Sequence, residues 1–162
     1  MQQGLFERPT PVYQGGALLE NINALIETWQ LSGGLVVFLQ HSNNKFLQRG
    51  SPGWRFHPAL RVDEADTLIQ KTQGDAFQGT ELKKLLDEYG LEHIAVSGLV
   101  TQGCVRATCL GGLKRGFRVS LVQGAHSTYS PDAAGVIAEW EANLARAGVQ
   151  VIPPKAIQSR FA

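Results

Sequence analysis

The sequence has little of several things that would mark a specialised class of protein. Its 162 residues include two cysteines, Cys104 and Cys109, too few for a disulfide framework, so a reducing, cytoplasmic setting is expected. The formal net charge is +1, without the excess of either sign that nucleic-acid or membrane partners favour. No apolar run approaches the ~18 residues of a membrane span, and the N-terminus lacks the apolar core of a signal peptide.

What is present is ordinary for one globular domain. Hydrophobic residues make up 43% of the chain and charged residues 18%, and the length is sufficient for a real core. No internal repeat, linker or low-complexity segment divides the chain. We therefore expect a single domain over residues 1–162.

Apolar residues form two kinds of pattern, which alternate along the chain. Helical spacing predicts helices at 16–32, 81–90, 104–115 and 132–147. Short apolar runs predict strands at 35–40, 67–71, 93–99, 117–124 and 149–154. Strands that alternate with helices favour an α/β architecture with a mostly parallel sheet. The chain opens with a loop and a helix, whereas such folds usually open with a strand.

Cys104 follows the predicted strand at 93–99 and opens the next predicted helix. Ligands bind beyond the carboxyl ends of strands in an open parallel sheet, and a helix N-terminus favours an anion. A thiolate at this point is a good nucleophile, and nearby backbone N–H groups can hold a developing oxyanion. The alternative is that Cys104 is a small apolar residue of the core. Cys109, inside the same helix, fits that alternative.

Four segments carry a resemblance to a known family. GLVTQGCVRAT, residues 98–108, resembles the nucleophile motif of the isochorismatase-like cysteine hydrolases, in the pattern G-x-x-T-x-x-C-V-x-x-T. KTQGDAF, residues 71–77, resembles the second motif of that family. GSPGWRFHPAL at 50–60 and GAHSTYS at 124–130 resemble two further family segments. The resemblance implies a doubly wound three-layer α/β sandwich with a mostly parallel central sheet.

The resemblance also implies catalytic roles. Cys104 would be the nucleophile that forms a covalent adduct with an amide or imide carbon, and Lys71 would orient the charges. The family has a cis peptide bond in the strand-to-helix turn, which falls here at Leu99–Val100. That bond would leave the Val100 and Cys104 amides as the oxyanion hole.

Other residues are candidates for the substrate pocket. Phe6, Trp54 and Phe77 could wall it, as aromatic residues often do, or could equally be loop packing. His41 could line the pocket or serve a hydrogen-bonded structural role. Nicotinamidases of this family bind a metal through D-x-H. The matching stretch here is Leu39-Gln40-His41, which has no aspartate, so neither a metal nor a cofactor is expected.

The third catalytic residue of the family is an aspartate at the end of the first strand, in an apolar run followed by D-x-Q. Met1 and Gln2 align with the last two positions, so the aspartate and its strand are expected to be absent from residues 1–162. The domain would then be N-terminally truncated relative to the family, with a gap in its sheet. Asp75 and His41 are the candidates for a substitute base.

These observations predict a cysteine-dependent hydrolase of a small amide, ureide or related C–N bond. The alternative is a non-catalytic paralogue of the same fold, kept for binding or assembly. A small-molecule substrate is the expected partner, together with a homo-oligomer by resemblance, and neither nucleic acid nor membrane is expected. Substrate identity would depend on the long loop at 45–60.

Overall fold

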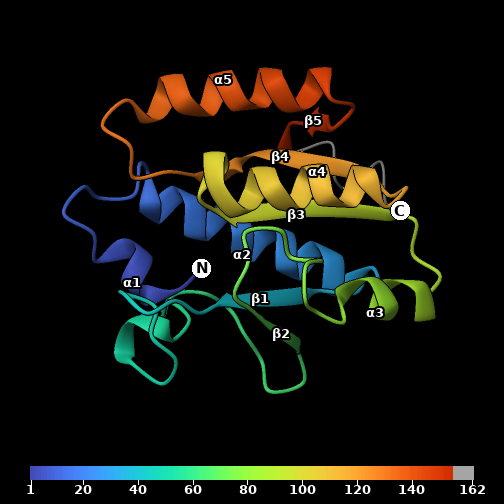
Figure 1. The fold of residues 1–162 in the computed structure, drawn as a ribbon, viewed down its shortest axis with the longest axis horizontal. Coiled ribbons are helices and arrows are strands. Elements are labelled where there is room, and N and C mark those ends of the chain that lie inside the picture. Colours follow the sequence, from blue (N-terminus) through green and yellow to red (C-terminus); the bar gives the residue numbers. More distant parts are fainter. Residues whose placement is uncertain (155–162) are drawn as a thin grey trace.

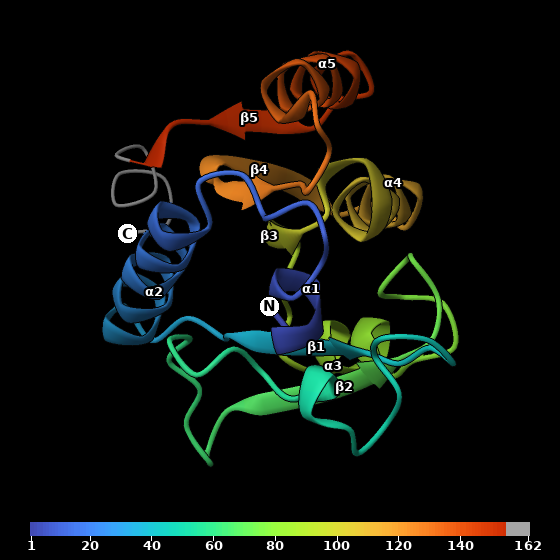
Figure 2. The same cartoon turned by 90° about the vertical axis from the view of Figure 1, so that its left-hand side faces the viewer.

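A computed structural model describes residues 1–154 and arranges them as parallel strands flanked by helices (Figure 1, Figure 2). The strands are β1 (Val37–His41), β2 (Thr67–Lys71), β3 (His93–Leu99), β4 (Arg118–Ser127) and β5 (Gln150–Ile152). They form two separate sheets with the orders β1-β2 and β3-β4-β5. All three pairings within these sheets are parallel.

Helices cover both faces of the strands. The helices are α1 (Gln3–Phe6), α2 (Gly15–Leu31), α3 (Leu82–Glu88), α4 (Arg106–Lys114) and α5 (Ala133–Arg146). A short 3-10 turn, η1, spans Pro52–Trp54, and a π-helical turn, η2, spans Thr101–Val105. In Figure 2, α2 lies on one side of the strands, and α4 and α5 lie on the other.

Two apolar cores separate these layers. The first core joins α2 to β1 and β4, and includes Leu18, Ile22 and Phe38. The second joins α3, α4 and α5 to the opposite face, and includes Leu86, Cys109 and Leu144. Apolar residues from both faces of β4 enter the cores, as expected for a strand covered by helices on both sides.

The predicted α/β fold is confirmed, although the bounds of most elements differ from the expectation by one or more residues, and two of these differences bear on the site. Strand β4 continues to Ser127, three residues beyond the predicted end. The helix predicted from residue 104 begins instead as the π-helical turn η2. In that turn, the Val100 carbonyl accepts the N–H groups of both Gly103 and Val105, and Gly103 itself has non-helical backbone angles. Cys104 therefore lies in the turn before α4.

The sheet is interrupted between β1 and β3. No backbone ladder joins these two strands within residues 1–154, although each pairs with a neighbour on its other side. The chain enters the fold through the short helix α1, as the sequence suggested, and no described strand precedes β1. The strands of the described chain therefore form a sheet with a gap between β1 and β3.

Within the described part of the chain, no helix combines the length and the apolar character needed to cross a bilayer.

Gly112 marks a close approach between α4 and the second sheet. A Cβ at this position would lie 2.9 Å from Ile94 Cδ1 and 3.0 Å from Val119 Cγ2. We expect Gly112→Ala to lower the free energy of unfolding by about 1–3 kcal/mol, because the added methyl overpacks the core. Urea denaturation measures the change.

The control for this substitution is Gly16→Ala in α2, where an added Cβ meets no atom within 4 Å. That change should leave stability unaltered or raise it by up to about 1 kcal/mol, because alanine is the better helix former. If Gly112→Ala were as stable as this control, the close approach would be wrong.

Candidate active site

Cys104 lies half-buried in the turn η2, directly beyond the carboxyl end of β3. The peptide bond between Leu99 and Val100 is cis, as the resemblance implied. Val100 directly precedes the turn that contains Cys104.

Two threonines of the cysteine motif hold this turn in place. The Thr101 hydroxyl donates to the Ser127 carbonyl at 3.0 Å and bonds His126 Nδ1 at 2.9 Å. Both partners are buried at the end of β4. Thr108 lies one helical turn after Cys104, and its Oγ1 accepts the N–H of Ala76 at 3.1 Å. The motif thus ties the nucleophile's turn to β4 and to the loop that follows β2.

Lys71 ends β2 and is buried, with 6% of its surface exposed. Its Nζ donates to the carbonyls of Gln73 at 2.7 Å and Gly74 at 3.2 Å, and lies 3.4 Å from His41 Nδ1. His41 is its register partner on β1. No carboxylate lies within ion-pair distance of Lys71 among residues 1–154. A buried ammonium without a carboxylate favours an anion nearby.

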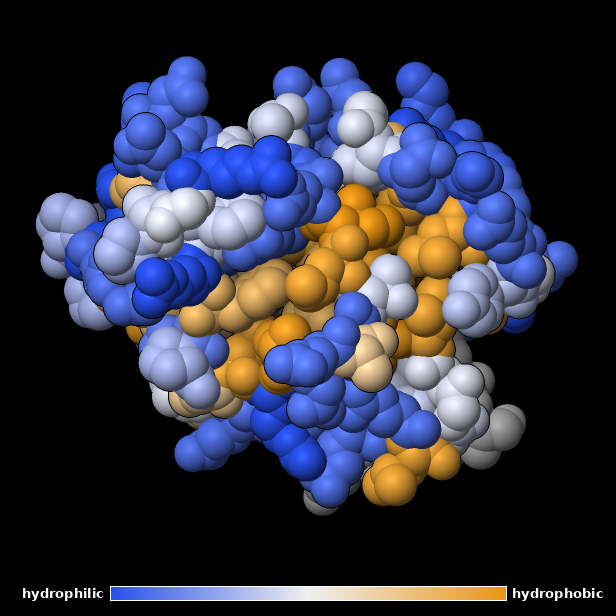
Figure 3. Space-filling view, turned by 90° about the horizontal axis from the view of Figure 1, so that it is seen from below, coloured by the Kyte–Doolittle hydropathy of each residue, from blue (hydrophilic) through white to orange (hydrophobic). Residues whose placement is uncertain are grey.

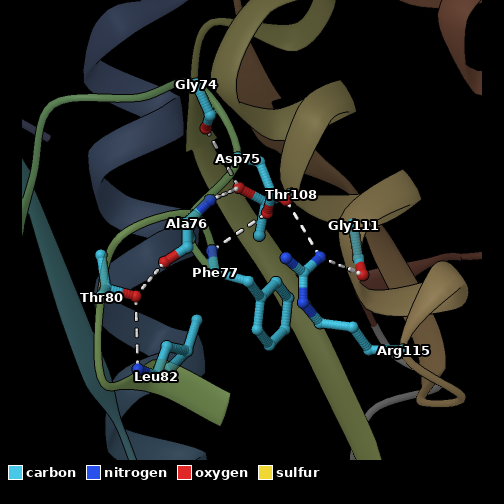
Figure 4. Close-up of polar contacts among 9 residues, drawn as sticks. All are labelled: Gly74, Asp75, Ala76, Phe77, Thr80, Leu82, Thr108, Gly111 and Arg115. Carbon is cyan, nitrogen blue, oxygen red and sulfur yellow. Dashed lines mark hydrogen bonds and ion pairs between the residues drawn. The ribbon is translucent and has the colours of Figure 1, made fainter.

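The loop that holds Lys71 is anchored to α4 by Asp75 (Figure 4). The Asp75 carboxylate accepts the N–H of Phe77 at 3.0 Å and pairs with Arg115 at 3.0 Å. The same guanidinium also donates to the Gly111 carbonyl at 2.9 Å. Asp75 therefore faces α4, and it is not among the residues that line the cavity. This placement gives Asp75 a structural role and removes it as a substitute base.

A cavity of about 290 Å³ opens at the carboxyl ends of the strands. His41 of β1, Lys71 of β2, and Val100 and Cys104 after β3 all line it. The two predicted catalytic residues therefore share one cavity, although they come from different sheets.

Of the four side chains predicted for the substrate pocket, His41 lines this cavity and the three aromatic ones do not. Phe6 packs its ring against His57, with centroids 4.5 Å apart. The indole of Trp54 donates to the Ser42 hydroxyl at 2.9 Å. Phe77 stacks on a phenylalanine of the second core and is 5% exposed. All three are loop and core packing, which was the alternative interpretation.

The environment of His41 favours the neutral form of its imidazole. Burial lowers its pKa below 6.5, and the charge of Lys71 lowers it further. A neutral imidazole can accept a proton, which makes His41 the remaining candidate base of the two named from the sequence.

The cavity also includes residues that the sequence argument missed. Met1, Phe46 and Tyr129 contribute to its lining. Burial and the charge of Lys71 lower the pKa of the Met1 amine to about 6, against the opposing effect of Cys104. Tyr129 lies within the GAHSTYS segment and Phe46 at the start of the long loop, so both were in segments that had been singled out.

Over residues 1–154, no group of three His, Cys, Asp or Glu side chains could hold an ion.

Comparison with protein families places this geometry in context. Residues 1–150 match the model of the isochorismatase domain. Two streptothricin hydrolases from Streptomyces noursei are 32% identical over 130 residues and 35% identical over 115 residues. Those alignments cover 79% and 69% of this chain, but 47% and 46% of the relatives. A maleamate amidohydrolase from Pseudomonas putida is 26% identical over 108 residues, 67% of this chain and 51% of the relative. The chain thus spans about half the length of these relatives.

Solved structures agree on the fold. The crystal structure of an isochorismatase family protein superposes with a TM-score of 0.87 at 26% identity, covering 93% of this chain and 92% of that one. A cysteine hydrolase from Pseudomonas syringae pv. phaseolicola reaches a TM-score of 0.90 at 22% identity, covering 99% and 88%.

The two cysteines should differ sharply in reactivity. Burial raises the pKa of the Cys109 thiol to about 12, so this thiol is unreactive at pH 8, whereas Cys104 lies in the cavity. Brief treatment with iodoacetamide, followed by peptide mapping, should label Cys104 alone. Lys71→Met should slow that labelling about tenfold, because a nearby cation favours the thiolate.

The control is Lys83→Met, which removes an exposed lysine that pairs with Asp87 on α3. It should leave the labelling rate of Cys104 unchanged. Labelling of Cys109 before Cys104 would contradict the assignment of the nucleophile.

Proposed function

The chain belongs to the isochorismatase family, and we propose that it is a cysteine-dependent hydrolase of a small amide, ureide or related C–N bond. The observation that carries the proposal is the cavity shared by Cys104 and Lys71 at the ends of the strands. The names of the relatives support it, since they include hydrolases and an amidohydrolase.

In the proposed reaction, the Cys104 thiolate attacks the carbonyl carbon of the substrate. A C–S bond forms while the π electrons of the carbonyl move to its oxygen, and the Val100 and Cys104 amides hold the oxyanion. Collapse of this intermediate breaks the C–N bond, and the amine leaves with the proton that the Cys104 thiol gave up before the attack, returned to it by the proton acceptor. Water then hydrolyses the acyl-cysteine and restores the thiol.

Lys71 would stabilise the negative charge of the Cys104 thiolate before it attacks the substrate. Its ammonium is buried and held by backbone carbonyls. Among residues 1–154, the candidate counter-anion in its cavity is the Cys104 thiolate. A cation in the same cavity would stabilise the thiolate that forms when the thiol gives up its proton.

The proton of the thiol needs an acceptor that can later donate to the amine. His41 is the group proposed for this role, since it lines the cavity and its pKa lies below 6.5. General acid–base assistance contributes about 10²- to 10⁴-fold to a rate. Without the aspartate that the family resemblance implies, we expect residues 1–162 to be a slow hydrolase.

The second candidate function is a non-catalytic paralogue that keeps the fold for binding or assembly. The observation that favours it is that no carboxylate lines the cavity among the described residues. The two candidates differ in whether any amide is turned over through Cys104.

Activity of the Cys104→Ser variant separates the two candidates. Ammonia release should be followed over a panel of small primary amides, imides and ureides. We expect the native chain to hydrolyse at least one member, and Cys104→Ser to lose the activity, because a serine hydroxyl in this site is far less ionised than a thiol. Cys109→Ser is the matched control and should retain it. Activity that survives in Cys104→Ser would contradict the mechanism, and an inactive native chain would favour the paralogue.

The role of His41 predicts a pH dependence. Because its pKa is lowered from 6.5, His41 is neutral at pH 7 and becomes protonated as the pH falls further. The rate should therefore drop on acidification below pH 6.5, and His41→Gln should lower kcat at pH 7.5 about 10²-fold and abolish that acid limb.

Asp75→Asn is the control for this profile. It should lower stability through the lost Arg115 pair but keep the shape of the pH profile. An unchanged profile in His41→Gln would show that another group is the base.

A further inference from the structure

His126 is a buried titratable residue that the proposed reaction does not use. It lies in the GAHSTYS segment near the end of β4 and is 2% exposed. Its two ring nitrogens contact two other elements. Nδ1 lies 2.9 Å from Thr101 Oγ1 in the turn η2, and Nε2 lies 3.2 Å from Glu141 Oε1 on α5. The imidazole therefore connects α5 to the turn that contains Cys104.

The Glu141 carboxylate determines which ring nitrogen carries the hydrogen. Its other oxygen, Oε2, accepts a hydrogen bond from Gln123 Nε2 at 2.9 Å. Because an ionised carboxylate is an acceptor only, the His126 nitrogen that faces it, Nε2, must be the donor. Burial lowers the pKa of His126 from 6.5, against the opposing effect of Glu141. At neutral pH the ring is therefore neutral, with its hydrogen on Nε2.

The opposite ring nitrogen is then free to accept a hydrogen bond from Thr101. The Thr101 hydroxyl has one hydrogen and two acceptors within reach, His126 Nδ1 at 2.9 Å and the Ser127 carbonyl at 3.0 Å. Two acceptors can share one hydrogen in a three-centre bond. Thr101 is fully buried, so the end of β4 holds its side chain at two points.

Thr101 transmits this restraint to the nucleophile. It is the first residue of η2 and precedes Cys104 by three positions. The carbonyl of the preceding residue, Val100, accepts the N–H groups of Gly103 and Val105, so the turn is bonded as a unit. The amides proposed for the oxyanion are those of Val100 and Cys104. A displacement of Thr101 would therefore move both amides and the thiol relative to a bound carbonyl group.

The three linked side chains do not belong to a ligand-binding surface. Thr101, His126 and Glu141 are not among the residues that line the catalytic cavity. They are equally absent from the lining of an apolar groove of about 540 Å³ formed by α2, α3, β1 and β3. Figure 3 views the molecule from below and shows apolar side chains gathered in a hollow between polar flanks. Any effect of the three side chains on the reaction must therefore pass through the turn.

We propose that Glu141 and His126 are positioning residues for the reaction at Cys104. Glu141 orients the imidazole, and the imidazole holds Thr101 and with it the turn η2. This inference rests on the proposed hydrolase and adds to it two residues that exchange no proton with the substrate.

Two substitutions of His126 separate its two contacts. Asparagine keeps a polar atom near the position of Nδ1, so His126→Asn retains the contact with Thr101 and loses the contact with Glu141. His126→Gln does the reverse, because glutamine keeps a polar atom near the position of Nε2. His126→Gln should lower kcat about tenfold with KM unchanged, since misplaced groups slow the chemical step. His126→Asn should retain more of the activity.

The matched control is Glu139→Ala, which removes an exposed carboxylate from the same helix as Glu141. It should leave kcat unchanged, whereas Glu141→Ala should lower it and Glu141→Gln should restore part of the loss. The glutamine side chain can still accept the hydrogen of Nε2. Unfolding in urea, measured for each variant, shows whether the loss of activity merely follows the loss of stability.

Two measurements need no substrate. In Glu141→Ala and His126→Gln, amide exchange over residues 100–105 should become at least tenfold faster, while exchange across α2 should change less. In the native chain at pH 7.5, ¹⁵N NMR of the histidine rings should place the His126 hydrogen on Nε2. Glu141→Ala should shift part of that hydrogen to Nδ1, because the acceptor of the Nε2 hydrogen is lost.

Several outcomes would overturn the proposal. One is an equal loss of kcat in His126→Asn and His126→Gln that only parallels their loss of stability. Another is unchanged exchange over residues 100–105 in Glu141→Ala, and a third is a native ring that carries its hydrogen on Nδ1. The NMR measurement on the native chain holds even if a variant fails to fold. A chain that hydrolyses no amide but shows the expected exchange and NMR results would contradict the proposed hydrolase and leave the restraint on the turn established.

Discussion

Burial of the Lys71 ammonium is the constraint on which the rest of the site depends. A buried charge persists only where its hydrogen bonds are satisfied, and here the carbonyls of Gln73 and Gly74 satisfy it. Those carbonyls are in place because Asp75 anchors their loop to Arg115 of α4's C-terminal end, the helix that begins just after Cys104. The lysine and the cysteine are therefore positioned by one continuous set of contacts, although they lie on different sheets.

The break in the sheet gives this arrangement a particular weakness. His41 and Lys71 belong to the β1-β2 sheet, whereas Cys104 follows β3. No ladder joins the two sheets in the described chain, so loop contacts, shared cores and the side chain of Gln2 hold the halves of the site together. Small displacements of a reacting group cost large factors in rate, so these contacts are important to the catalytic geometry.

The local sequence pattern predicted the structure well where it depends on a single helix or strand. The run at 93–99 became β3 with the predicted bounds, since a short apolar run between polar boundaries has few alternatives to a buried strand. The cis bond at Leu99–Val100 was also found, but that expectation came from the family resemblance and not from the local pattern. The aromatic residues Trp54 and Phe77 show the limit of such reasoning. An aromatic ring suits a pocket wall and a core equally well, and only its neighbours decide between them.

The sequence by itself determined which chemistry this protein has at hand: a cysteine between a strand and a helix, a lysine at a strand end, and the α/β order that sends both to one edge of the fold. Tertiary structure decided which side chains meet there. It turned Asp75 away toward Arg115 and placed His41 beside Lys71, and it left two strand edges facing an apolar groove. The physical reason is the distance along the chain over which each interaction acts. Hydrophobic period and turn chemistry act over a few residues, whereas burial, ion pairing and strand pairing depend on residues far apart in the chain.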